Sequence, residues 1–174
     1  MPAALLAFAS TQGSRDAAGR PHRVLIPGCG SAYEAAFLDS LGWAVTALDF
    51  SAAAIESARR NLGDWGGMLL QADFFAHQPD APYALVYERA FLCALPRRLW
   101  SDYGERMAQL LAVDGCLAGF YFFSDEPKGP PFGIARESLD ALLNPYFKLE
   151  AEADVHDSIG PFAGRERWMV WRRR

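Results

Sequence analysis

The sequence predicts an α/β fold with a doubly wound, mostly parallel sheet that ends in an antiparallel C-terminal strand. Three observations predict it. Short apolar runs alternate with helical patterns, a glycine-rich turn follows the first run, and the chain closes on two neighbouring strand patterns at 147–155 and 166–171. The 174 residues, 51% of them hydrophobic, fit one domain over residues 1–174 with a sizeable core.

The first half reads as three strands and two helices, each bounded by a recognisable signal. The first strand runs straight into the glycine turn, and the helix after it stops before Gly42. Ser51 is placed to cap the second helix, and the glycines at 63, 66 and 67 break the chain before the third strand. The expected elements are a strand at 24–26, a helix at 31–41, a strand at 44–50, a helix from Ser51 and a strand at 68–72.

The second half continues the alternation and then changes character. Prolines at 79 and 82 mark a turn before the fourth strand, Pro96 precedes a helix, and Asp114-Gly115 is expected to turn the chain into the fifth strand. The segment 124–132 is rich in proline and glycine and is expected to be a loop. The expected elements are strands at 83–87 and up to 123, helices at 97–111 and 137–143, and the closing pair of strands.

The glycine turn Gly28-Cys29-Gly30 points to a nucleotide-like ligand. It follows an apolar strand, and about 20 residues later a second strand ends in Asp49, the layout in which an acid holds ribose hydroxyls. A dinucleotide fingerprint needs a third glycine at the position of Tyr33. The pattern therefore favours S-adenosylmethionine over a dinucleotide-dependent reductase. An α/β domain with a tight turn and no ligand is the plain alternative.

Ligands of open α/β sheets bind at the carboxyl ends of the strands, so the residues at those ends are the candidate cofactor site. Asp49 is expected to accept hydrogen bonds from the ribose, and Asp73 from the adenine amino group. Phe50 or Phe74 is expected to pack on the adenine ring. The full candidate set is Pro27, Gly28, Cys29, Gly30, Tyr33, Asp49, Phe50, Ser51, Asp73, Phe74 and Glu88.

Glu88 and Arg89 directly follow the fourth apolar run and are the candidate catalytic residues. Arg89 is expected to orient an anionic or soft nucleophile. A thiol with a pKa near ~8.5 becomes appreciably ionised at neutral pH when a cation lies beside it. A mutual ion pair between Glu88 and Arg89, or simple surface exposure, is the alternative interpretation.

Charge and composition argue against a nucleic-acid-binding or membrane-spanning protein. The net charge of −4 gives no general reason to bind nucleic acid, and no apolar run reaches the ~20 residues that span a bilayer. Three cysteines without metal-ligand spacing indicate a reducing compartment, and Cys29 is expected to fill space. No metal site is expected. The protein is interpreted as cytoplasmic, as a monomer or weak dimer, with the terminal basic triplet Arg172-Arg173-Arg174 as a solvated tail.

Four segments together resemble the thiopurine S-methyltransferase family, with its thiol and halide methyltransferase relatives. Pro27 to Gly30 with Tyr33-Glu34 resembles its cofactor turn, although Ala32 stands where many members have glycine. Asp49-Phe50-Ser51 is similar to its ribose-binding segment. The segment 88–96 resembles its acid-arginine signature, with Glu88 in place of the usual aspartate, and Gly129-Pro130-Pro131-Phe132 resembles its loop beside the acceptor.

The resemblance implies a class I methyltransferase fold and methyl transfer from S-adenosylmethionine, without a metal, to a small-molecule thiol or to selenium, tellurium or halide. S-Adenosylhomocysteine is the product. Arg89 then contacts the acceptor, and Pro130, Pro131 and Phe132 lie beside it. The N-terminal lid segment of the family is expected to be short or truncated here. An O- or N-methyltransferase of a small metabolite, and a non-catalytic cofactor-binding regulator or partner subunit, are the alternatives.

Overall fold

The structure is a computed structural model that describes residues 1–174. The chain forms two compact units, residues 1–87 and residues 88–174, which are described in turn. No helix in either unit is both long and apolar enough to cross a membrane.

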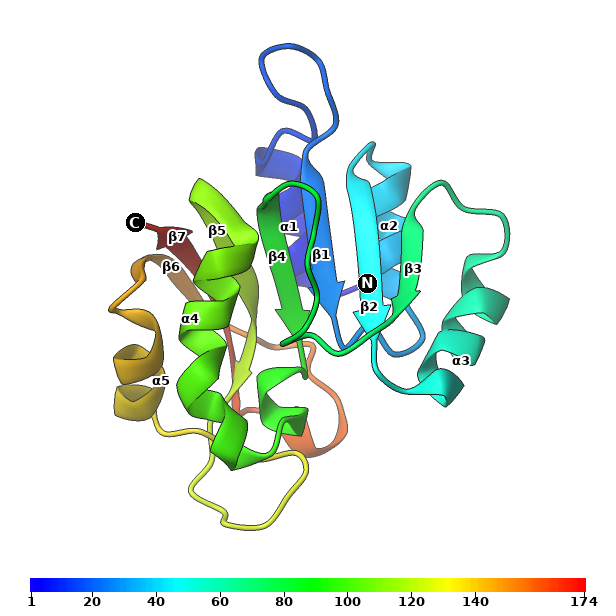
Figure 1. Ribbon diagram of the computed structural model, residues 1–174. Helices are drawn as coiled ribbons and strands as arrows, with labels where there is room; N and C mark the ends of the chain where they lie inside the picture. The colour runs from blue at the N-terminus through cyan, green and yellow to red at the C-terminus, as the bar shows by residue number, and fades with distance from the viewer. The chain divides into compact units, whose positions relative to one another are not determined.

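The first unit is built on parallel strands. β1 (Arg23–Pro27) pairs with β2 (Ala44–Asp49) on one side and with β4 (Tyr83–Arg89) on the other, and β2 pairs in turn with β3 (Met68–Gln71). The strand order is therefore β3-β2-β1-β4, with β1 and β2 central, as Figure 1 shows. The carboxyl ends of β1, β2 and β3 all point to the same edge of this sheet.

The first unit contains three helices, each with a buried apolar face, and a side chain caps one of them. These helices are α1 (Ala3–Thr11), α2 (Tyr33–Ser40) and α3 (Ala52–Leu62). The hydroxyl of Ser51 accepts a hydrogen bond from the Ala54 N–H at 3.3 Å, the cap that the sequence predicted. Ile55 and Ala58 lie on one face of α3 and are buried. The central residues of β1, from Val24 to Ile26, are buried as well, so the strands form the middle of the core.

The second unit contains an antiparallel group of strands, β5 (Leu111–Phe122), β6 (Phe147–Asp154) and β7 (Glu166–Arg173), in the order β5-β7-β6. α4 (Trp100–Leu110) lies against β5, and α5 (Arg136–Leu143) lies beside α4 (Figure 1). Gly104 permits this approach, because a Cβ there would overlap the carbonyl oxygen of Leu142. Short 3₁₀ turns, η1 (Leu92–Ala94), η2 (Arg97–Leu99) and η3 (Gly160–Phe162), connect the elements.

These strand directions confirm the predicted fold class, an α/β fold with a parallel sheet and antiparallel final strands. Several boundaries differ from the prediction. β4 continues through Glu88 and Arg89, and Asp114 is not a turn before β5 but a residue within it, at φ 61°. The helix α1 was not predicted. That the whole chain is a single domain stays a prediction.

The prediction that the last three arginines form a solvated tail is wrong. Arg172 and Arg173 belong to β7, and Arg172 bonds Glu150 and the carbonyl of Asp114. The guanidinium of Arg173 donates to the carbonyl of Leu111, and that of Arg174 to the carbonyl of Phe147. The three arginines thus tie the end of the chain to β5 and β6. A charge run alone does not reveal this, because the partners, Glu150 and three backbone carbonyls, are distant in sequence.

Candidate active site

The turn after β1 is held in a backbone conformation that favours glycine. Gly28 and Gly30 have φ values of 61° and 52°, and Ala32 has φ 58°. A Cβ added at Gly30 would meet nothing within 4 Å, so open space lies beside the turn. The left-handed conformation of Ala32 explains why a glycine suits this position. The turn therefore offers backbone and empty space to a ligand.

Asp49 connects the end of β2 to this turn. Its Oδ2 accepts a hydrogen bond from the Gly30 N–H at 3.1 Å, and its Oδ1 accepts one from the Ser51 N–H at 2.9 Å. The side chain is buried, with 8% exposed. A carboxylate has about four lone-pair positions, so these two bonds leave capacity for further donors such as hydroxyl groups. Asp49 therefore holds the glycine turn in place through the Gly30 N–H.

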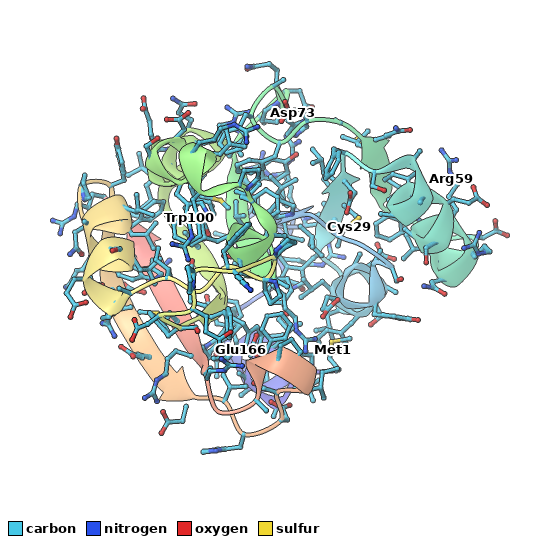
Figure 2. The ribbon with its side chains drawn as sticks, turned by 90° about the horizontal axis from the view of Figure 1, so that it is seen from below. Met1, Cys29, Arg59, Asp73, Trp100 and Glu166 are labelled. Atoms are coloured by element: carbon cyan, nitrogen blue, oxygen red, sulfur yellow. The ribbon has the colours of Figure 1, made fainter.

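The two phenylalanines that sequence reasoning could not separate lie in different environments. Phe74 is buried and packs edge-on against Phe75, with ring centroids 5.1 Å apart. Phe50 is 81% exposed, and Tyr33 is 65% exposed. Asp73, labelled in Figure 2, is exposed and accepts a hydrogen bond from the Phe75 N–H. Of the two rings only Phe50 has a free face, so Phe74 serves the core.

Cys29, also labelled in Figure 2, fills space in the turn. Its side chain is buried, and burial together with the nearby charge of Asp49 raises the pKa of the thiol to about 12. A thiol with such a pKa is not nucleophilic at neutral pH. Pro27 closes β1 directly before the turn and is buried.

Glu88 in the second unit is a buried carboxyl group rather than an exposed one. Its Oε1 accepts from the N–H groups of Phe91 and Leu92 at 3.0 and 3.4 Å, and its Oε2 accepts from the Tyr103 hydroxyl at 2.8 Å. Burial raises its pKa to about 7 against the effect of these donors. Glu88 therefore holds the chain that follows β4 and does not face solvent.

Arg89 is the next residue and is half-buried. Its guanidinium carbon lies 5.4 Å from the centroid of the Phe120 ring, a cation–π contact with a residue of β5. Ala90 follows at φ 56°, so the backbone turns sharply straight after the arginine. Gly119 allows β5 to pass close by, because a Cβ there would overlap the carbonyl oxygen of Glu88.

The proline loop is joined to the same segment. The Phe132 N–H donates to the carbonyl of Cys93 at 2.7 Å. Phe132 lies beside the guanidinium of Arg97, at 5.6 Å from the ring centroid, and Arg97 also contacts the ring of Trp100, which Figure 2 labels at the start of α4. Pro130 is exposed and Pro131 half-buried.

Sequence reasoning missed Glu166, which opens β7 (Figure 2). The residue pairs with Phe122 across β5 and β7, is 6% exposed, and receives a hydrogen bond from the Ser158 hydroxyl at 2.5 Å. Burial raises its pKa, while the positive charge of Arg89 opposes the rise. An acid directly before the apolar run Trp168 to Trp171, separated from it by one arginine, was the signal that could have found it.

Comparison with known proteins decides the family. A family model described as thiopurine S-methyltransferase matches residues 6–174. The chain belongs to this family. It is 29% identical to "Probable thiol methyltransferase 2" of Arabidopsis thaliana over 160 residues, 87% of this chain and 70% of that protein. It is also 29% identical to a thiopurine S-methyltransferase of Pseudomonas aeruginosa, over 86% of this chain and 77% of that protein.

Other relatives are matched over less of their length: the match to the Vibrio campbellii thiopurine S-methyltransferase spans 42% of that protein. Among solved structures, magnesium protoporphyrin IX methyltransferase from Synechocystis with bound S-adenosylhomocysteine has a TM-score of 0.79 at 15% identity, covering 98% of this chain and 81% of that one. The family and the methyltransferase fold confirm two predictions, the class I fold and an enzyme of the S-adenosylmethionine-dependent methyltransferase class.

Proposed function

We propose that this chain transfers a methyl group from S-adenosylmethionine to a small-molecule thiol or a related soft nucleophile. The match of the thiopurine S-methyltransferase family model to residues 6–174 carries the proposal. The relatives' names, thiol methyltransferase and thiopurine S-methyltransferase, support sulfur as the accepting atom. A small-molecule acceptor, a monomer or weak dimer, and a reducing cytoplasmic compartment belong to the same proposal, and the three cysteines are free and buried.

The first unit fits the cofactor. The open space beside Gly30, the carboxylate of Asp49 and the exposed ring of Phe50 match a nucleoside with ribose hydroxyls and an aromatic base. We assign the ribose to Asp49, the adenine amino group to Asp73 and the adenine face to Phe50. The cofactor supplies an electrophilic methyl group on a sulfonium, so the protein needs to bind, orient and exclude water rather than to provide covalent chemistry.

The second unit provides the acceptor's charge partner. We assign the developing thiolate to Arg89, whose guanidinium is fixed against Phe120. Pro130, Pro131 and Phe132 form the apolar boundary of the acceptor. Glu88 is then a positioning residue. It is buried and accepts hydrogen bonds from the N–H groups of Phe91 and Leu92, and so it fixes the backbone that directly follows Arg89.

Replacing the arginine tests the acceptor assignment. Arg89→Ala is expected to lower methyl transfer to thiols roughly 100-fold, the order of loss when one charge-stabilising group is removed. Calorimetric titration with S-adenosylhomocysteine should give an unchanged affinity. Arg98→Ala is the matched control, since Arg98 is an exposed arginine in η2 of the same unit. Loss of cofactor affinity in Arg89→Ala, or activity equal to that of the control, would contradict the assignment.

A further inference from the structure

A second charged residue accompanies Arg89 in the same unit. β5 and β7 pair so that Phe120 faces Trp168 and Phe122 faces Glu166. Directly opposed residues of an antiparallel pair project to the same face, and residues two apart on a strand share that face. The cation of Arg89 lies over Phe120, and Glu166 lies opposite Phe122, two residues further toward the carboxyl end of β5. That end is where ligands of α/β sheets bind.

The environment of Glu166 leaves one oxygen for a ligand. The Ser158 hydroxyl donates to Oε2 at 2.5 Å, which leaves the lone pairs of Oε1 for a proton or for another donor. The charged and titratable groups near it are Arg89, which attracts it, Asp157, which repels it, and Glu88 and Cys93, whose own pKa values its charge raises. Burial outweighs the attraction of Arg89, so the pKa of Glu166 is raised, while Arg89 favours the charged form of the carboxyl group.

We propose that Glu166 is the base that takes the proton of the acceptor thiol, and that Arg89 attracts the resulting thiolate. This inference rests on the proposed function and adds the fate of the proton. The S–H bond breaks and its proton passes to Oε1. The electron pair of the thiol sulfur forms the new S–CH₃ bond, while the bond between that methyl group and the cofactor sulfonium breaks and leaves its pair on the cofactor sulfur.

The physical reason for this proton transfer is that the number of buried charges stays the same. Before the proton moves, the buried negative charge resides on Glu166; afterwards it resides on the thiolate, and Arg89 attracts whichever of the two groups is charged. No additional charge is buried, so the transfer avoids the desolvation cost that an uncompensated thiolate would carry in the same place. Burial of Glu166 helps, because a carboxylate with a raised pKa binds a proton more readily.

The test compares two kinds of acceptor, one that must lose a proton before it is methylated and one that carries no proton. In Glu166→Gln, methylation of an alkyl thiol is expected to fall roughly 100-fold, as for loss of a general base. Methylation of iodide, which carries no proton, is expected not to fall, because the variant removes a negative charge that repels iodide. Glu150→Gln is the matched control, because Glu150 is also a strand glutamate bonded to an arginine, Arg172. An equal loss on both acceptors, or no loss on the thiol, would overturn the inference.

The wild-type enzyme gives a second measurement that does not depend on the variant folding. Over a series of thiols, the acid limb of kcat/KM is expected to stay at one pH, that of Glu166, and to be absent for iodide. A limb that moves with the pKa of each thiol would mean that the thiolate forms in solution, and would overturn the inference while leaving the proposed function intact. If the wild type methylates neither thiols nor iodide, the proposed function fails and the inference fails with it.

A binding readout separates the proton step from turnover. In the presence of S-adenosylhomocysteine no methyl group is available, so a chromogenic aryl thiol can bind without reacting. Below the pKa of the free thiol, the wild type is expected to show the thiolate absorption band on binding, and Glu166→Gln to bind the neutral thiol without that band. A thiolate band of equal strength in the variant would show that Glu166 does not receive the proton.

Discussion

At the scale of single residues, Glu88 shows how burial and hydrogen bonds compete. Three donors favour its carboxylate form, yet full burial raises its pKa from 4.5 to about 7. Between those two pH values the folded protein holds a proton that the unfolded chain has released. The folded state therefore binds more protons, and the free energy of unfolding falls as pH rises through this window.

The measurable consequence lies in the pH dependence of stability. Urea unfolding between pH 4.5 and 8 should show the wild type losing up to roughly 3 kcal/mol relative to Glu88→Gln, from about 1.4 kcal/mol per unit of pKa shift. The amide oxygen of glutamine can still accept from the Phe91 and Leu92 N–H groups. Because both proteins contain all the other acidic groups, the contribution of those groups to the pH dependence cancels in the comparison. Parallel curves for the two proteins would show that Glu88 titrates normally.

Residue type and position were predictable where the chemistry is local. The cap at Ser51 follows from short-range spacing, whereas the hydrogen bond from the Gly30 N–H to Asp49, 19 residues further along the chain, was not predicted. The choice between Phe50 and Phe74 was not predictable, because both follow a strand and only packing distinguishes an 81% exposed ring from a buried one. Glu166 was missed for a similar reason: its neighbour Arg89 is far away in sequence.

At the scale of elements, the end of α3 depends on one glycine. Gly63 has φ 56° and ψ −136°, and a Cβ there would touch nothing within 4 Å. The cost of Gly63→Ala is therefore backbone strain alone, expected at about 1–2 kcal/mol in the free energy of unfolding. Gly66→Ala is the control, since its Cβ would make an ordinary 3.7 Å contact with Asp39. Equal stability of the two variants in thermal or urea unfolding would refute this explanation.

Element existence was easier to predict than element ends. The strands and helices from β1 to β3 lie close to their expected ranges, because glycine and proline mark the boundaries. α1 was overlooked although Leu5, Phe8 and Ala9 lie at helical spacing and are buried. It lacks the usual start signals: Pro2 precedes it and no side chain caps it. The extension of β4 through two charged residues was not expected either, because a buried Glu88 needs partners that the sequence does not reveal.

At the scale of the whole molecule, the two proposed ligands are assigned to different units, the cofactor to residues 1–87 and the acceptor contacts to residues 88–174. Substitutions should therefore separate binding from transfer. A ligand that binds only the folded state at 100 times its Kd adds about 2.7 kcal/mol of stability, which for a chain of this size corresponds to about 5–10 °C in Tm.

S-Adenosylhomocysteine is expected to raise the Tm of the wild type and of Arg89→Ala by this amount, because Arg89 is assigned to the acceptor. In Asp49→Ala the rise should disappear, since the ribose loses its carboxylate and the glycine turn loses the bond to the Gly30 N–H. Each shift is measured against the same variant without ligand, so a lower starting Tm does not affect the comparison. A full shift in Asp49→Ala would place the cofactor elsewhere, and a lost shift in Arg89→Ala would make the arginine part of the cofactor site.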